Sequence, residues 1–218
     1  MLKVKAVIFD MDGLMVDTEP VGNMICVQAH KKFGYEITQE MLFDLIGRNG
    51  HSAREYYVQV FGEDYPYQQI REESQKLHTE YYQNHEIAVK PGLYELLDYL
   101  KKSGIKMAVA SSTVTSRVQS NLERIHVLSY FDEVIGGDQI IHGKPAPDIF
   151  LKALELLQVS ADQALVLEDS KNGILASYYA HIPVICIPDI VKHTKETLDK
   201  TYKVLDRLDQ VINEVEKL

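Results

Sequence analysis

The sequence predicts an α/β fold, a Rossmann-like parallel sheet core with a small helical domain inserted after the first strand. Three observations lead to this prediction. Short, continuous apolar runs alternate with amphipathic helical patterns, which is typical of buried parallel strands joined by helical crossovers. Residues 18–87 interrupt this alternation with helical patterns alone. Carboxylates, hydroxyls and a lysine follow successive apolar runs, as expected where strands of an open sheet end at a ligand site.

The apolar runs place the strands. The first run covers residues 4–9 and leads into the sequence DMDG. The other runs are IKMAVA (105–110), YFDEVIG (130–136), QALVLE (163–168) and IPVICI (182–187). Between them, helical periodicity with leucine or isoleucine on one face predicts helices within 93–104, 148–159 and 172–182. The order of these elements favours right-handed β-α-β crossovers.

The segment between the first strand and the rest of the sheet has four helical patterns, at residues 21–34, 38–47, 52–62 and 67–85. Pro91 and Gly92 then end the last of these helices and restart the chain, as expected of a hinge. We therefore divide the chain into a discontinuous core, residues 1–17 and 88–218, and a helical cap, residues 18–87.

Composition narrows the classes of function. The chain has 218 residues, 45% of them apolar and 25% charged, as in ordinary globular proteins that bury a real core. Its net charge of −9 would repel the nucleic acid backbone, so we expect no nucleic acid partner. Neither a signal-peptide layout nor an apolar run of membrane-spanning length is present, and we expect a cytoplasmic protein without a membrane partner. Cys26 and Cys186 are read as buried, reduced thiols.

The predicted strand ends bring together residues suited to one chemistry. Asp10 and Asp12 follow the first strand and, two residues apart on an extended chain, face the same way. The other candidates, which follow later strands, are Ser111, Ser112, Lys144, Glu168 and Asp169. Taken singly, each has an ordinary reading as a turn residue, a helix cap or a surface lysine. Their ordered appearance at successive strand ends favours a single site.

The acidic residues of this set require a cation. Two carboxylates about 4 Å apart repel each other by about 4 kcal/mol at an effective dielectric constant of 20. Hard oxygen ligands favour Mg²⁺ together with a substrate phosphate. We therefore expect Asp169, helped by Glu168, to anchor Mg²⁺ beside Asp10, and the metal and Lys144 to attract a small anionic substrate to an acidic protein.

Roles follow from this arrangement. Asp10 would attack phosphorus, and Asp12 would protonate the leaving oxygen and later deprotonate water. Ser111 and Lys144, with the neighbouring Ser112, would hold the phosphoryl oxygens.

The chain resembles the haloacid dehalogenase superfamily over nearly its whole length. FDMDGLMVDTEP resembles the first motif of that superfamily, VASS the second, the lysine of GKPAPDIF the third and VLEDSKNGILA the fourth. The insert resembles the C1-type cap of subfamily IA, in its phosphatase and β-phosphoglucomutase branch. The resemblance implies a phosphoaspartate at Asp10, acid and base catalysis by Asp12, and Mg²⁺ held by Asp10, the backbone carbonyl of Asp12, and Asp169.

Differences within the superfamily narrow the activity. Dehalogenase relatives lack the second aspartate, which is Asp12 here. Phosphonate-cleaving relatives use a cap lysine, and TEPVGNMICV contains none. The mutase has a cap histidine where this chain has Gly22, which favours water as the acceptor of the phosphoryl group. Arg48 lies where the cap loop of the superfamily meets substrate, and we assign it a specificity role with an ordinary surface arginine as the alternative.

The sequence thus predicts a monomeric, Mg²⁺-dependent phosphatase that acts on a small phosphorylated metabolite, a sugar phosphate or similar monoester. Two alternatives remain open. One is an isomerase like β-phosphoglucomutase, and the other is a non-catalytic phosphate-binding module like a receiver domain.

Overall fold

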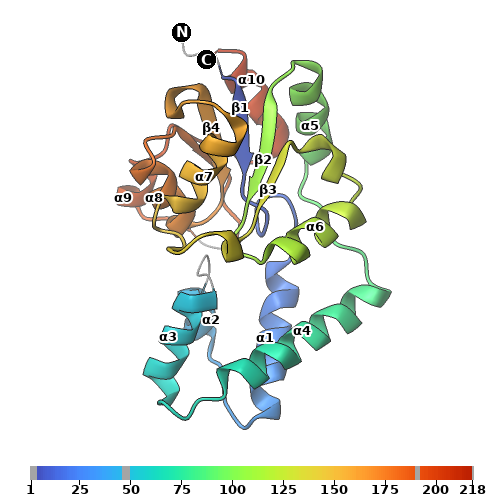
Figure 1. Ribbon diagram of the computed structural model, residues 1–218, viewed down its shortest axis with the longest axis vertical. Helices are drawn as coiled ribbons and strands as arrows, with labels where there is room; N and C mark the ends of the chain where they lie inside the picture. Colours follow the sequence, from blue (N-terminus) through green and yellow to red (C-terminus); the bar gives the residue numbers. More distant parts are fainter. Residues whose placement is uncertain (1–3, 46–49, 190–191, 218) are drawn as a thin grey trace.

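The computed structural model describes residues 4–45, 50–189 and 192–217. Within them, six strands form one sheet in the order β3-β2-β1-β4-β5-β6, and every neighbouring pair is parallel (Figure 1). The strands are β1 (Ala6–Phe9), β2 (Lys106–Ala110), β3 (Glu133–Ile135), β4 (Ala164–Glu168), β5 (Val184–Cys186) and β6 (Lys203–Val204). The predicted α/β class with a parallel Rossmann-like sheet is confirmed.

Each of the five predicted apolar runs contains a strand. The sixth strand, β6, was not predicted, because it is only two residues long and both residues are exposed. It joins the sheet by pairing its backbone with β5, where Ile185 lies opposite Lys203. Its sequence therefore shows no apolar run.

The central strand β1 is buried on both faces, which explains its continuous apolar sequence. Val7 and Phe9 pack into one hydrophobic cluster, and Ala6 and Ile8 pack into a second cluster across the sheet. The first cluster draws on α5 (Leu93–Lys102), α6 (Thr115–Arg124) and α10 (Val211–Val215). The second draws on α7 (Asp148–Leu157) and α8 (Lys171–Tyr179), while the short α9 (Lys195–Leu198) packs against α8.

Four helices lie between β1 and α5 in the chain, and Figure 1 draws them as a group below the sheet. They are α1 (Glu19–Lys32), α2 (Gln39–Leu45), α3 (Gly50–Phe61) and α4 (Tyr67–Asn84). They bury a cluster of their own around Ala29, Tyr57, Tyr65 and Ile70, which is separate from the two clusters of the sheet. None of the helices in the described residues combines the length and apolar character needed to cross a bilayer.

The chain leaves the sheet and returns to it through two paired segments. The backbone N–H of Asp17 donates to the carbonyl of Ala88 at 2.8 Å, and that of Lys90 donates to Met15 at 2.9 Å. The Lys90 ammonium also lies 3.3 Å from Asp17 and 2.6 Å from Asp189. The two connections between the helical group and the sheet are therefore held together by backbone hydrogen bonds and ion pairs.

Candidate active site

The loop after β1 places two carboxylates at the carboxyl end of the sheet. Asp10 and Asp12 follow β1 directly, and Gly13 turns the chain with a φ of +85°. A Cβ atom at Gly13 would lie 2.3 Å from Oδ2 of Asp169. Glycine is therefore needed twice here, for its left-handed backbone and for the close approach of the Asp169 carboxylate.

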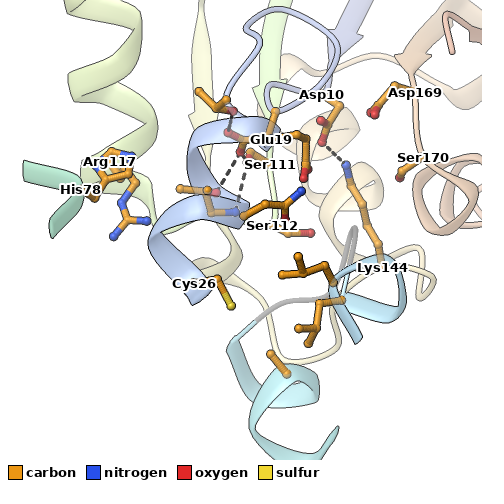
Figure 2. A pocket seen from close by; sticks show the side chains of 18 of the residues that line it. Asp10, Glu19, Cys26, His78, Ser111, Ser112, Arg117, Lys144, Asp169 and Ser170 are labelled. Atoms are coloured by element: carbon orange, nitrogen blue, oxygen red, sulfur yellow. Dashed lines mark hydrogen bonds and ion pairs between the residues drawn. The ribbon is translucent and has the colours of Figure 1, made fainter. Parts of the chain in front are cut away.

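Lys144 lies against Asp10, as its place in the predicted site requires. Its Nζ atom lies 2.5 Å from Oδ1 of Asp10, and Figure 2 shows this pair. The same atom lies 2.6 Å from Oε1 of Glu168 and 3.1 Å from the carbonyl of Ala110. Only 4% of Lys144 is exposed, and its ammonium also lies 4.9 Å from the centre of the Phe150 ring. The two carboxylates raise the pKa of Lys144 although its burial acts in the opposite direction, so Lys144 is a buried cation at neutral pH.

Glu168 is held from both sides. One oxygen accepts the hydrogen bond from Lys144, and the other accepts from the N–H of Asp169 at 3.0 Å and from Ser170 N–H and Oγ at 2.9 and 3.0 Å. The residue is fully buried, and a Cβ at Gly173 would overlap its carboxylate. Its carboxylate is therefore fixed in place, where it orients both Lys144 and the backbone of residues 169–170.

Asp10, Glu168 and Asp169 form a buried acidic cluster. One oxygen from each of the three carboxylates lies within 4.8 Å of the other two. Burial raises the pKa of Asp10 to about 8, against the lowering effect of Lys144, and burial and Glu168 raise the pKa of Asp169 well above its usual range. Oδ1 of Asp169 is buried and has no hydrogen-bond partner among the described residues. These residues fit a hard divalent cation, because an unpartnered carboxylate oxygen among buried acids is what such an ion neutralises.

Asp12 lies outside this cluster, in a set of hydroxyl groups. Its Oδ1 accepts from Thr18 at 2.6 Å, and its Oδ2 accepts from Thr113 at 2.9 Å and Ser111 at 3.3 Å. The side chain of Asp12 is thus oriented by three donors from two different loops, and all three are neutral hydroxyl groups. Thr18 and Thr113 were not among the predicted site residues, although Thr18 stands in the first motif, FDMDGLMVDTEP, and Thr113 directly follows the second, VASS.

A cavity of about 330 Å³ lies over these residues, which is within the usual size of a small-molecule site. From the sheet it is lined by residues of the predicted set, namely Asp10, Asp12, Ser111, Ser112, Lys144 and Asp169. From the helical group it is lined by α1, α2, α3 and α4, through residues that include Glu19, Leu42, Tyr57 and His78. The cavity therefore lies between the sheet and the inserted helices.

The structure brings most of the predicted residues together. Six line the cavity, and the seventh, Glu168, lies behind it as the partner of Lys144. Arg48 lies outside the described residues. The sequence analysis did not place Glu19, His78 and Arg117 in the site, nor the ionisable residues Cys26 and Tyr57 that line the same cavity. His78 belongs to an ordinary helical pattern and Arg117 to no motif, whereas Glu19 stands in the first motif, FDMDGLMVDTEP, but was not selected as a site residue.

Glu19 adds a further acid to the cavity wall. Burial and the charges of Asp12, Asp189 and Asp17 together raise its pKa to about 7. The wall close to Asp12 is therefore acidic, whereas Lys144 provides the positive charge on the side of Asp10.

The parallel α/β sheet, with carboxylates and a lysine at its carboxyl end, is the kind of site that suits hydrolysis or transfer of a phosphoryl group. Comparison with known proteins identifies the family. The sequence profile of the haloacid dehalogenase-like hydrolases matches residues 7–187. This chain belongs to that family, in its subfamily IA phosphatase branch, and the predicted class of enzyme, a phosphoric monoester hydrolase, is confirmed.

Individual relatives agree with this assignment. The chain is 32% identical over 184 residues to a phosphorylated carbohydrates phosphatase of Thermotoga maritima, with 82% of each protein covered. It is 30% identical over 195 residues to (DL)-glycerol-3-phosphatase 2 of Arabidopsis thaliana, covering 84% of this chain and 79% of that protein. Among solved structures, CbbY from Rhodobacter sphaeroides in complex with phosphate superimposes with a TM-score of 0.85 at 25% identity, covering 95% of this chain and 96% of that one. A crystal structure described as a putative β-phosphoglucomutase from Thermotoga maritima has a TM-score of 0.73 at 27% identity, with 99% of this chain and 100% of that one covered.

Proposed function

We propose that this chain is a Mg²⁺-dependent phosphatase that hydrolyses a small phosphorylated metabolite, a sugar phosphate or similar monoester, through a phosphoaspartyl intermediate on Asp10. One observation carries the proposal. Asp10 lies in the cavity 2.5 Å from a buried lysine and beside Asp169, which has an unpartnered oxygen. The names of the Thermotoga carbohydrate phosphatase and the Arabidopsis glycerol-3-phosphatase support this class of substrate.

The chemistry takes place at the side chains of Asp10 and Asp12. An oxygen of Asp10 forms a bond to phosphorus while the bond from phosphorus to the ester oxygen breaks. Asp12 donates a proton to the departing oxygen. In the second step Asp12 takes a proton from water as that water attacks the phosphoaspartate, which releases phosphate and restores Asp10. The three hydroxyl donors on Asp12 support this role, because they keep its carboxyl group in one orientation.

The acidic cluster would hold the metal. Asp10 and Asp169, with the backbone carbonyl of Asp12, are the ligands that we assign to Mg²⁺. A bound Mg²⁺ would supply the positive charge that lets an anionic phosphate approach three buried carboxylates. Both oxygens of Glu168 already accept hydrogen bonds, so we assign to it the positioning of Lys144 and of Asp169, and the help in metal binding expected from the sequence would be indirect, through Asp169.

Lys144, Ser111 and Ser112 would bind the phosphoryl oxygens. The three hydrogen-bond partners of the Lys144 ammonium already match its three N–H donors, so a phosphoryl oxygen must replace one of them. Asp10 is the partner that lines the cavity, and its bond to Lys144 is the one that substrate would exchange. Lys144 would then stabilise the charge on the phosphoryl group as it is transferred.

We further propose that residues 18–87 act as a cap over the site. The separate hydrophobic cluster of α1–α4 and the paired connections at residues 15–17 and 88–90 support a unit that moves as one body. The placement of cavity residues on both sides supports closure over substrate, which would exclude bulk water and leave the cap to select the leaving group.

Gly22 supports water as the acceptor. It lines the cavity, and a Cβ atom built there would meet none of the described residues within 4 Å. Among those residues, packing does not impose the absence of a side chain. The β-phosphoglucomutase-like isomerase remains the second candidate, supported by the structural similarity to the Thermotoga protein described as a putative mutase.

The test is phosphate release from a panel of phosphate monoesters, measured with Mg²⁺ and with EDTA. We expect release with Mg²⁺ only, and a loss of at least about 10³-fold in Asp10→Asn. Asp162→Asn is the matched control, because Asp162 is exposed and lies before β4, at the opposite edge of the sheet. No release from any substrate would overturn the proposal, and so would an Asp10→Asn variant that keeps more than a few percent of activity.

The same assay separates the alternatives. Incubation of a hexose 1-phosphate with a trace of hexose bisphosphate would give mainly hexose 6-phosphate if the chain were a mutase, and free phosphate if it is a phosphatase. A receiver-like module would instead accumulate a stable phosphoaspartate without turnover.

A further inference from the structure

A second basic group lines the cavity away from Lys144. Arg117, from the first turns of α6, and His78, from α4, form part of the same wall. Figure 2 shows these two residues next to each other, on the other side of the cavity from Lys144 and Asp10. Arg117 comes from the sheet side of the cavity and His78 from the inserted helices, so the two halves of the molecule meet here.

The Arg117 side chain has no hydrogen bond or ion pair with any of the residues that the structure describes. It is nevertheless partly buried, and burial together with Arg71 lowers its pKa while the charge of Asp12 raises it. A guanidinium keeps its proton under all these influences. Arg117 is thus a half-buried cation in the cavity wall whose donors have no protein acceptor among the described residues, so its guanidinium can pair with an anion that enters the cavity.

The carboxylates of the 330 Å³ cavity aside, the described groups around Arg117 favour an anion over a cation. Burial and the neighbouring arginines, Arg117 and Arg124, lower the pKa of His78 to about 4, so at neutral pH it adds a neutral hydrogen-bonding group. A second cavity of about 360 Å³ shares Arg117 and His78 as its wall. Its described lining otherwise consists of a valine, a tyrosine, another arginine and residues with hydroxyl or amide groups, namely Gln75, Thr79, Tyr82, Val114, Ser116, Ser120, Asn121 and Arg124. No carboxylate belongs to that described lining.

An ordinary surface arginine explains these observations less well. Exposed arginines extend their charge into water, whereas Arg117 lines two cavities and is partly removed from solvent. Asp12 is the acid whose charge acts on Arg117, but its two oxygens are already occupied by Thr18, Thr113 and Ser111. The cation is therefore available to a ligand.

We propose that Arg117 determines specificity by binding a second anionic group of the substrate, a phosphate or a carboxylate, while the phosphoryl group to be cleaved lies at Asp10. The inference rests on the proposed function. It specifies the class of substrate of this enzyme as a phosphate monoester that carries a second anionic group at the end away from the phosphoryl group to be cleaved. A guanidinium suits both kinds of anion, because its fork of donors matches two oxygens at once. The phosphoryl group would lie at Asp10 in the 330 Å³ cavity, and the second anion would lie at Arg117, where this cavity and the 360 Å³ cavity share Arg117 and His78 as lining residues.

The test compares matched substrates that differ by one anion. Glycerol 3-phosphate against 3-phosphoglycerate tests a carboxylate, and fructose 6-phosphate against fructose 1,6-bisphosphate tests a phosphate. We measure the ratio of kcat/KM for the substrate with two anions to that for its partner. In Arg117→Gln we expect this ratio to fall about tenfold or more for at least one pair, mainly through KM, and in Arg117→Lys to fall less.

Arg54→Gln is the matched control, because it removes the same charge from an exposed position on α3 that does not line the 330 Å³ cavity. It should leave both ratios as in the wild type. A ratio that is the same in wild type and Arg117→Gln for both pairs would overturn the proposal. Thermal unfolding and circular dichroism of each variant show whether it folds, and Arg117→Lys provides a second, milder variant.

A binding measurement keeps this proposal separate from the proposed function. Isothermal titration calorimetry measures the binding of fructose 1,6-bisphosphate and of 3-phosphoglycerate to the Asp10→Asn variant. This measurement needs no turnover. Adding Arg117→Gln should weaken the affinity for at least one of these ligands about tenfold. If the wild type released no phosphate, the proposed function would fail, and this titration would still decide whether Arg117 binds an anion. Equal affinities with and without Arg117 would overturn the inference whatever the activity.

Discussion

Lys144 lies 2.5 Å from Asp10, although 134 positions in the chain separate the two residues. The contact forms because β1 and β2 are neighbours in the sheet, so that the loop carrying Lys144 reaches both Asp10 and the carbonyl of Ala110 at the end of β2. The same ammonium pairs with Glu168 at the end of β4. One buried cation thus joins the ends of the three central strands.

This relationship predicts a large effect of Lys144 on stability as well as on activity. In Lys144→Met two buried carboxylates lose their cation, and we expect the free energy of unfolding to fall by about 3–5 kcal/mol. Urea denaturation in EDTA measures this fall without a contribution from metal. Adding Glu168→Gln should restore part of the loss, because it removes one of the two unpaired charges.

The control for Lys144→Met is Lys32→Met, which breaks the ion pair of Lys32 with Glu73 near the surface of the helical group. We expect that change to cost at most about 1 kcal/mol. Equal losses in the two variants would contradict the central place of Lys144 in the core.

Gly13 should be sensitive to a single methyl group. Its φ is +85°, and a Cβ would lie 2.3 Å from Oδ2 of Asp169. Gly34 has a similar φ of +82°, but a Cβ there would meet no atom of the described residues within 4 Å. Gly34→Ala should therefore cost only the backbone penalty, about 1–2 kcal/mol. Gly13→Ala should cost clearly more and weaken Mg²⁺ binding, as urea denaturation and calorimetric titration would measure. Similar effects of the two variants would show that the contact with Asp169 is relaxed at little cost.

Mg²⁺ should stabilise the folded protein through the acidic cluster. A ligand that binds only the folded state adds about 2.7 kcal/mol of stability at 100 times its Kd, so Mg²⁺ should raise the melting temperature in a concentration-dependent way. Asp169→Asn should abolish this rise, because it removes the carboxylate whose buried oxygen lacks a partner. Asp162→Asn should keep it. A rise in the melting temperature that survives Asp169→Asn would place the ion elsewhere.

His30 should make stability depend on pH. Burial lowers its pKa. Its Nδ1–H donates to the carbonyl of Cys26 at 2.7 Å, and its Nε2 accepts from the hydroxyl of Tyr65 at 2.5 Å. The folded state therefore favours the neutral form of the His30 ring. The unfolded state takes up a proton near pH 6.5 and the folded state only at lower pH. The stabilisation is therefore complete above about pH 6.5 and is lost as the pH falls towards the lowered pKa.

The measurement is the free energy of unfolding at pH 8 and pH 5 for the wild type and His30→Gln. The variant should be less stable at pH 8, by about 1–3 kcal/mol, and should lose less stability than the wild type between pH 8 and pH 5. His51→Gln, at an exposed position, should follow the wild-type profile. A His30→Gln variant with the same pH dependence as the wild type would show that another group is responsible.

Local pattern was sufficient for much of the architecture. Buried strands in a parallel sheet must be apolar on both faces, so the runs at residues 4–9, 105–110 and 163–168 identified the three central strands. The parallel arrangement then placed their carboxyl ends at one edge, which is why Asp10, Ser111 and Asp169 could be grouped from the sequence. The edge strand β6 could not be predicted from the sequence, because its two residues are exposed and are held by backbone hydrogen bonds that any sequence can make.

The chain order alone could not show which side chains complete the cavity or how the charges pair. Glu19, His78 and Arg117 line one cavity only because helices from distant parts of the chain pack against one another, and the helical pattern that contains His78 would be the same if that side chain pointed into solvent. The two hydrogen-bonded oxygens of Glu168 and the unpartnered oxygen of Asp169 are likewise properties of three-dimensional packing. Strand ends and their reactive residues follow from short-range burial, whereas the shape of the cavity and the ionisation of its groups depend on contacts that form only when the whole chain is folded.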